Sequence, residues 1–160
     1  MSTEEVTIVP ITPAEVTFHE ATSEERKQSW AVNGISWAGP LSNEQYVDRE
    51  FNLSLTELAR NGGTKYWVLT RKADGELVAA CESTLKSVLV ADRKTGYREV
   101  KAYAIASVYT PAKFRKQGMA GYLLGEFKKW VDGEDATEIS VLYSDIGTVS
   151  LKHSNAYSFF

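Results

Sequence analysis

The sequence predicts one α/β (α+β) domain with a mixed, largely antiparallel central sheet and flanking helices. Three observations support this prediction. Several short runs alternate apolar with polar residues, three longer segments place apolar residues three or four positions apart, and Gly, Asn or Pro residues separate these segments. The expected order is β-α-α-β-β-β-α-β, and 160 residues is an ordinary length for a single domain.

The first half of the chain predicts one strand followed by two helices. The run EVTFHEA alternates apolar with polar residues, as a half-buried strand does. Thr22 stands three positions before Glu25, and Ser42 stands three before Gln45; this capping-box pattern begins a helix. We expect the first helix to run through SEERKQSWAVNG and the second to end at the Asn-Gly-Gly of positions 61–63. The apolar positions expected along the second helix are Val47, Phe51, Leu55 and Leu58.

The second half predicts four strands and one helix. Two apolar runs, Tyr66–Thr70 and Leu77–Ser83, flank Ala73-Asp74-Gly75, and Asp-Gly between two strands is a strong hairpin signal. The polar run DRKTGYRE predicts a loop, and VKAYAIASVYT predicts a central strand that ends at Pro111, because proline cannot donate to a sheet. A short strand at 138–143 comes last. The helix before it is expected to carry Met119, Leu123, Phe127, Trp130 and Val131 on its apolar face.

The composition excludes several classes of protein. With 18 Lys and Arg residues against 21 Asp and Glu residues, the net charge is −3, which argues against general binding to nucleic acid or to an anionic membrane. The single cysteine, Cys81, cannot form an intramolecular disulfide, and two histidines without spaced cysteines make no zinc site. No stretch approaches the roughly 18 apolar residues of a membrane-spanning helix, and the acidic start is unlike a signal peptide. We therefore expect a cytoplasmic domain that holds no metal.

The segment from Ser107 to Ala120 carries the clearest functional signal. After Pro111 a helix opens within Arg115-Lys116-Gln117-Gly118-Met119-Ala120. The first amides of a helix point the same way and carry partial positive charge, which suits a pyrophosphate. Gly118 and Ala120 leave room for phosphate oxygens to reach the backbone. The alternative is an ordinary strand-to-helix turn; the flanking strand and helix favour the phosphate site.

This segment resembles the acetyl-CoA-binding motif of the GCN5-related N-acetyltransferases, Arg/Gln-x-x-Gly-x-Gly/Ala. The resemblance implies that the loop holds the CoA pyrophosphate, and that the strand before it separates from its neighbour and pairs with pantetheine. It also implies acetyl-CoA as the co-substrate and no metal. The cofactor-binding residues that it implies are Ser107, Val108, Tyr109, Arg115, Lys116, Gln117, Gly118, Met119 and Ala120.

Longer stretches are similar to one branch of that family, the fungal lysine acetyltransferases of lysine catabolism. They include the Trp-containing first helix, AIASVYTPAKFRKQGMA and SVLYSDIG, and the likeness extends from about Val16 to Gly147. It implies that acetyl passes by direct attack to the side-chain amine of free L-lysine. Two alternatives stay open: an acetyltransferase acting on a peptide or another amine, and a non-catalytic module that binds CoA or a partner.

Three residues are candidates for the chemistry. An amine with an ordinary pKa of about 10.4 must lose a proton before it attacks a thioester. Glu82, in an otherwise apolar run, is the candidate proton acceptor, because burial would raise its pKa; the alternative is a carboxylate that faces solvent. The main-chain N–H of Val108 is the candidate donor to the oxyanion. Asp145 either caps a following helix or meets the lysine ammonium. Core packing is expected for Cys81, Trp30, Trp37, Trp67 and Trp130.

The resemblance ends near Gly147, where the family continues into a fourth helix and two more strands. We expect the N-acetyltransferase domain at 1–147 and a tail without family pattern at 148–160. The chain would then be a C-terminally truncated member with little activity. Its last strand, SVLY, would lie at an edge of the sheet and be open to self-association with another copy of the chain.

Overall fold

The computed structural model confirms the predicted order of helices and strands, β-α-α-β-β-β-α-β. The structure describes residues 6–94, 96–134, 137 and 139–142, so Asp145 and the 148–160 tail lie outside the described residues. The elements are β1 (Val16–Glu20), α1 (Ser23–Trp37), α2 (Asn43–Ser54), β2 (Thr64–Arg71), β3 (Leu77–Asp92), β4 (Gly96–Tyr109), α3 (Met119–Glu134) and β5 (Ile139–Leu142), with short 3₁₀ turns η1 (Pro13–Glu15) and η2 (Ala112–Phe114).

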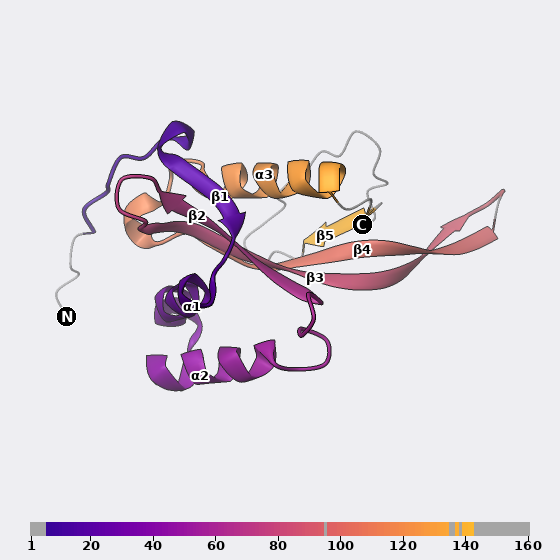
Figure 1. Cartoon of the computed structure of the whole chain (residues 1–160), viewed down its shortest axis with the longest axis horizontal. Coiled ribbons are helices and arrows are strands. Elements are labelled where there is room, and N and C mark those ends of the chain that lie inside the picture. The colour runs from indigo at the N-terminus through magenta and orange to yellow at the C-terminus, as the bar shows by residue number, and fades with distance from the viewer. Residues whose placement is uncertain (1–5, 95, 135–136, 138, 143–160) are drawn as a thin grey trace.

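The strands form one sheet in the order β1-β2-β3-β4-β5. Neighbours from β1 to β4 run antiparallel, and β5 runs parallel to β4, from the Ala102–Ile139 pair to the Ile105–Leu142 pair. Helices α1 and α2 lie on one face of the sheet and α3 lies on the other (Figure 1). The predicted mixed, largely antiparallel sheet is therefore confirmed, with β5 at one edge of the described strands.

The main hydrophobic core lies between the sheet and α3. Trp67 of β2 packs against Phe127 and Trp130 of α3, with ring centroids 5.7 Å and 4.5 Å away. The Trp67 indole N–H donates to Ser83 Oγ at 2.9 Å, so this buried polar group is satisfied. The apolar face predicted for the third helix is correct, since α3 buries Met119, Leu123, Phe127 and Val131 and half-buries Trp130.

Both predicted capping boxes are present at the beginnings of α1 and α2. Thr22 Oγ1 accepts from Glu25 N–H and Ser42 Oγ accepts from Gln45 N–H, each at 3.2 Å. These bonds satisfy amides that have no acceptor inside the helix. None of the described helices combines the length and the apolar character needed to cross a membrane.

Helix α2 ends at Ser54, earlier than the predicted stop at 61–63. The Ser54 hydroxyl donates to Phe51 C=O at 2.6 Å and the Thr56 hydroxyl donates to Leu53 C=O at 2.8 Å. Such local bonds compete with continuation of the helix, and turns then lead to β2. Of the apolar residues predicted to line this helix, Leu55 and Leu58 lie beyond its end and are exposed, and Phe51 is exposed within it.

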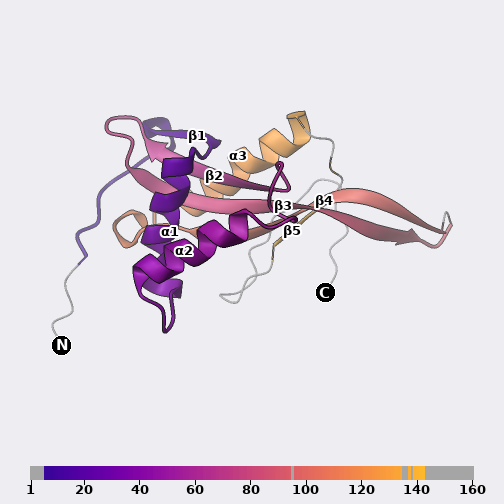
Figure 2. The ribbon, with the colours of Figure 1, turned by 60° about the horizontal axis from the view of Figure 1, so that its bottom comes forward.

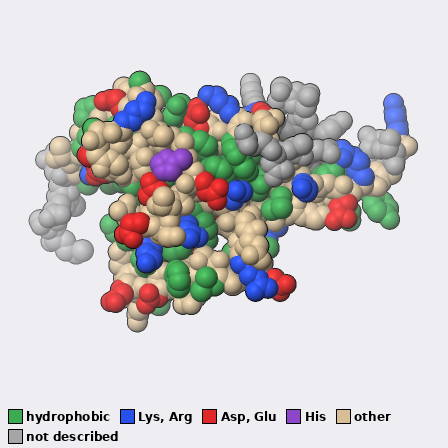
Figure 3. Space-filling view, in the orientation of Figure 1, with side chains coloured by type: hydrophobic (Ala, Val, Ile, Leu, Met, Phe, Trp, Pro, Cys, Tyr) green, Lys and Arg blue, Asp and Glu red, His purple; other side chains and the backbone are tan. Residues whose placement is uncertain are grey.

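Strands β3 and β4 extend beyond the rest of the sheet as a two-stranded arm (Figures 1 and 2). Their pairing continues to Asp92 opposite Gly96, so most of the segment predicted as a loop at 92–99 is strand. The loop prediction was wrong because the segment is polar, and polarity does not prevent pairing. An antiparallel pair of strands with solvent on its faces can carry polar side chains and still form its backbone hydrogen bonds. Leu89 and Tyr97, 70% and 78% exposed, share one face of the arm, which also carries basic and acidic side chains (Figure 3).

Candidate active site

A β-bulge in β4 shapes the site. The register between β3 and β4 shifts between positions 80 and 82 of β3, so that Ser107 and Val108 of β4 lie opposite the single residue Cys81. Ser107 takes a left-handed backbone conformation, with φ of +54°. On the other side of β4, the described pairing with β5 ends at Ile105. The regular pairing of β4 with β3 is therefore interrupted at Ser107 and Val108 and resumes at Tyr109.

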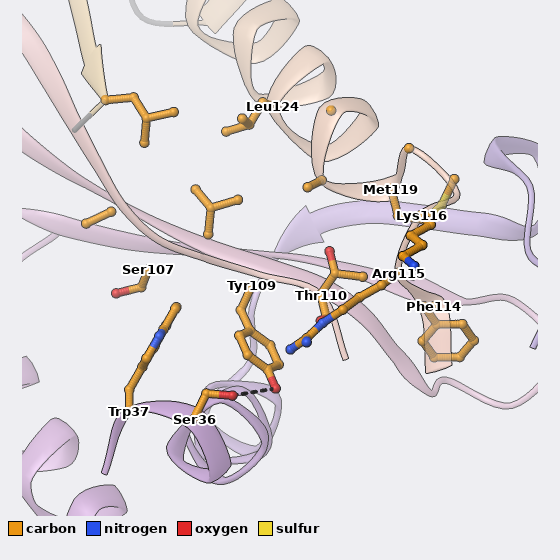
Figure 4. A pocket seen from close by; sticks show the side chains of 16 residues that line it. Ser36, Trp37, Ser107, Tyr109, Thr110, Phe114, Arg115, Lys116, Met119 and Leu124 are labelled. Atoms are coloured by element: carbon orange, nitrogen blue, oxygen red, sulfur yellow. Dashed lines mark hydrogen bonds between the residues drawn. The ribbon is translucent and has the colours of Figure 1, made fainter. Parts of the chain in front are cut away.

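A cavity of about 730 Å³ lies beside this bulge (Figure 4). Its walls are the end of β4, the beginning of α3 and the last turn of α1. All the cofactor-binding residues predicted from the sequence line it except Gln117, and Val108, the candidate oxyanion donor, is among them. Residues that the sequence analysis did not place there include Ser36, Trp37, Thr110, Phe114, Gly121 and Leu124.

The backbone amides at the beginning of α3 lie at this cavity. Tyr122 N–H donates to Gly118 C=O at 2.9 Å. The N–H groups of Met119, Ala120 and Gly121 precede that bond and have no acceptor inside the helix, and all three residues line the cavity. A Cβ atom on Gly118 or Gly121 would meet no atom within 4 Å. The helix start is therefore open to a ligand, and its partial positive charge favours an anion.

Arg115 and Lys116 bring positive charge to the mouth of the cavity. Arg115 Nε donates to Thr110 C=O at 2.9 Å, and its guanidinium lies 5.4 Å from the centre of the Tyr109 ring (Figure 4). Lys116 is exposed and has φ of +62°, and Gly118 has φ of +77°. Two left-handed residues so close together turn the chain sharply into α3.

Gln117 does not line the cavity, because its side chain points toward the N-terminal segment. Its side-chain Oε1 accepts from Ile11 N–H at 2.9 Å, and its Nε2 donates to Val9 C=O at 2.8 Å. Val9 N–H in turn donates to Lys113 C=O at 2.9 Å. The Gln117 side chain thus ties the loop to the N-terminal segment, and only its main chain remains for a cofactor.

Glu82 lies half-buried beside the bulge, where Ser107 Oγ donates a 2.7 Å hydrogen bond to its carboxylate. Burial raises the pKa of Glu82, the bond from Ser107 opposes that rise, and the nearby Glu50 carboxylate adds to it. This agrees with the expectation from the sequence. A carboxylate with a raised pKa is better suited to accept a proton from an amine.

Two neighbours of Glu82 are less suited to proton transfer at neutral pH. Burial raises the pKa of the Cys81 thiol to about 12, so little thiolate forms and Cys81 acts as core packing, as expected. Tyr66 pairs directly with Glu82 from β2, and burial raises its pKa to about 12. Of these three groups, the carboxylate is the one suited to accept a proton.

Trp37 lies at the site and not in the core. It is 43% exposed, and its ring meets the Tyr109 ring edge-on with centroids 5.3 Å apart. Its neighbour Ser36 has its Oγ 3.5 Å from the Tyr109 hydroxyl (Figure 4). The prediction that the tryptophans pack in the core is correct for Trp30 and Trp67 and wrong for Trp37. Nothing local in the sequence marks the last turn of α1 as part of a cavity wall.

No family model matches the chain. Among curated proteins, it is similar to a protein named lysine acetyltransferase from Yarrowia lipolytica, with 25% identity over 153 aligned residues. The alignment takes in 83% of this chain but only 38% of the relative. The chain thus spans well under half the length of that protein.

Solved structures share the fold at low sequence identity. A GCN5-related N-acetyltransferase from Ralstonia eutropha is 12% identical with a TM-score of 0.57, covering 89% of this chain and 98% of its own. A structure from Clostridium acetobutylicum, described as a predicted acetyltransferase with acetyl-CoA, is 12% identical with a TM-score of 0.58, covering 91% and 96%. These structures show that the chain has the fold of N-acetyltransferases, and the name of the curated relative agrees with the resemblance found in the sequence.

Proposed function

We propose that this chain, a member of the GCN5-related N-acetyltransferase superfamily, transfers an acetyl group from acetyl-CoA to an amine. The observation that carries the proposal is the cavity of about 730 Å³ between the open amides of α3 and the bulge of β4, beside which Glu82 lies. The cavity offers an anion site at the beginning of α3. Glu82 does not line the cavity itself but accepts a bond from Ser107 in its wall, and transfer from a CoA thioester needs both an anion site and a proton acceptor.

The residues present fit acetyl-CoA. The amides of Met119, Ala120 and Gly121 would bind the pyrophosphate, with charge added by Arg115 and Lys116. The end of β4, from Ser107 to Tyr109, would bind the pantetheine arm through its main chain. When bound, acetyl-CoA supplies an activated acetyl thioester.

The chain's own groups then act on the amine and on the developing charge. Glu82 would accept the proton that the ammonium must lose, while the bond from Ser107 holds its carboxylate in place. Val108 N–H would donate to the carbonyl oxygen as negative charge develops there. Asp145 remains a second candidate near the acceptor, on the resemblance alone.

We propose free L-lysine as the acceptor, through its side-chain amine. The support is the name of the Yarrowia lipolytica relative, lysine acetyltransferase, together with the sequence stretches that resemble the fungal enzymes. A peptide acceptor is the competing proposal, because the same cofactor site serves either amine.

The test is acetyl transfer from radiolabelled acetyl-CoA to free lysine, to a lysine-containing peptide, or to no acceptor. We expect labelled acetyllysine above the background without acceptor, at the low rate that the sequence predicts for this chain. General-base catalysis typically contributes 10²–10⁴-fold, so Glu82→Gln should lower turnover by about 100-fold while leaving CoA binding unchanged. Labelling of the peptide alone would show that the acceptor is a peptide and not free lysine. If no amine were labelled, the proposed activity would be contradicted.

A further inference from the structure

Asn33 of α1 carries a buried side-chain oxygen that has no hydrogen-bond partner. The residue is 3% exposed, and its Oδ1 accepts a bond from none of the described residues. An unpaired buried acceptor is costly and uncommon in folded proteins, so it calls for a physical reason. A ligand that donates to this oxygen would recover the cost.

The direction of α1 shows where that oxygen lies. Trp30 packs edge-on against Tyr66 of β2, with centroids 5.6 Å apart, and Trp37 packs edge-on against Tyr109 of β4. Seven residues of helix rise about 10 Å, and two strand spacings also span about 10 Å. Helix α1 therefore crosses from β2 over β3 to β4, and Figure 2 shows it steeply inclined to the strands.

Asn33 lies between those two tryptophans on the buried side of α1, and hence over β3. Tyr66 pairs with Glu82, and Tyr109 pairs with Ala80. A line from Tyr66 to Tyr109 thus crosses β3 between Ala80 and Glu82. Asn33 thus lies over the part of the sheet that carries the candidate proton acceptor, one turn before the residues of α1 that line the cavity.

We propose that Asn33 Oδ1 and the Glu82 carboxylate together bind the acceptor amine, Asn33 from the helix and Glu82 from the sheet. A primary ammonium has three N–H donors and no acceptor, so it matches two side chains that offer acceptor oxygens, one from the helix and one from the sheet. When Glu82 takes one proton, the neutral amine still donates to Asn33 and keeps its lone pair for the thioester carbon. This inference rests on the proposed function and names the residue that recognises its acceptor.

The deciding variant is Asn33→Leu, which removes the oxygen at similar size. We expect at least tenfold weaker binding of free L-lysine and of n-butylamine, which offers an amine alone. CoA affinity should be unchanged, and the melting temperature should stay the same or rise, because an unpaired buried polar group has been replaced by an apolar one. A purely structural Asn33 would give the opposite pattern: a lower melting temperature and unchanged amine affinity.

Two further variants complete the test. Asn33→Asp keeps an acceptor oxygen and should bind lysine within a few-fold of wild type. Ser29→Ala is the control: Ser29 is also buried in α1, but its hydroxyl already donates to Arg26 C=O at 2.8 Å, so amine binding should not change. Asn33→Ala, which also lacks the oxygen, takes the place of the leucine variant if that variant does not fold.

The measurement is an NMR titration of the amines in the presence of CoA, which needs no turnover. Equal amine affinity in wild type and Asn33→Leu overturns the proposal, and so does a wild-type chain that binds neither amine. If lysine binds as expected but no acetyl is transferred in the radiolabel assay, the proposed function fails while the role of Asn33 in amine binding stands.

Discussion

Ser107 Oγ donates a 2.7 Å hydrogen bond to the carboxylate of Glu82, 25 positions earlier in the chain. The β4 bulge brings the two side chains together, because it inserts Ser107 next to the strand that carries Glu82. The bond favours the charged form of the carboxylate, and burial disfavours it. Burial therefore raises the pKa of the candidate proton acceptor, and the β4 bulge limits that rise through Ser107.

Removing this bond should change the pH dependence of the activity. Ser107→Ala deletes the donor that lowers the pKa of Glu82, so that pKa should rise further. Because the carboxylate must be ionised to accept a proton, the acidic limb of the kcat profile should move to higher pH. Ser36→Ala, which also alters the cavity wall, should leave the limb in place. If the acidic limb of the Ser107→Ala profile did not move, Glu82 would not be the group that accepts the proton.

Glu82 should also make stability depend on pH. Burial raises its pKa, so the folded chain holds this proton more tightly than the unfolded chain does. Its contribution to stability is therefore present below the ordinary carboxyl pKa and is lost as pH rises through the raised one. Glu82→Gln should melt at a higher temperature than wild type near pH 8 and at about the same temperature near pH 4. Differential scanning calorimetry at both pH values checks this, and a constant difference would contradict it.

The beginning of α3 should accept an anion and reject a negative side chain. Ala120→Glu places a carboxylate where the pyrophosphate is proposed to bind, and we expect CoA affinity to fall by at least tenfold. Gly125→Glu adds the same charge further along α3, at a position that does not line the cavity and where a Cβ meets no atom within 4 Å. Isothermal titration with CoA should show a much smaller loss for that control. Equal losses would mean that net charge, and not the helix start, governs binding.

Gln117 should act on CoA binding through the loop that it holds. Gln117→Leu removes the bonds to Val9 and Ile11 while keeping a side chain of similar size. The left-handed residues Lys116 and Gly118 then lose a tether, so we expect the KM for acetyl-CoA to rise several-fold with kcat little changed. Gln28→Leu, at an exposed position of α1, is the control. A fall in kcat without a change in KM would argue against this positioning role.

The sequence by itself determined the elements whose signals lie within a few neighbouring residues. The capping boxes at Thr22 and Ser42 begin helices because a side chain reaches an amide three positions away. The apolar face of α3 follows from spacing along one helix. The loop from Arg115 to Ala120 could be predicted as an anion site because glycine, charge and the helix start are adjacent in the chain.

Only the tertiary structure decided the contacts that join distant segments. The register shift that brings Ser107 to Glu82, the placement of Trp37 against Tyr109 and the position of Asn33 over β3 all depend on how strands align and how α1 crosses them. The spacing of apolar residues in the sequence predicts on which face of a strand or helix a residue lies. It does not predict which residue of another strand will lie opposite it. That choice is made by hydrogen-bond register and helix packing between elements far apart in sequence, and it decides which side chains share a site.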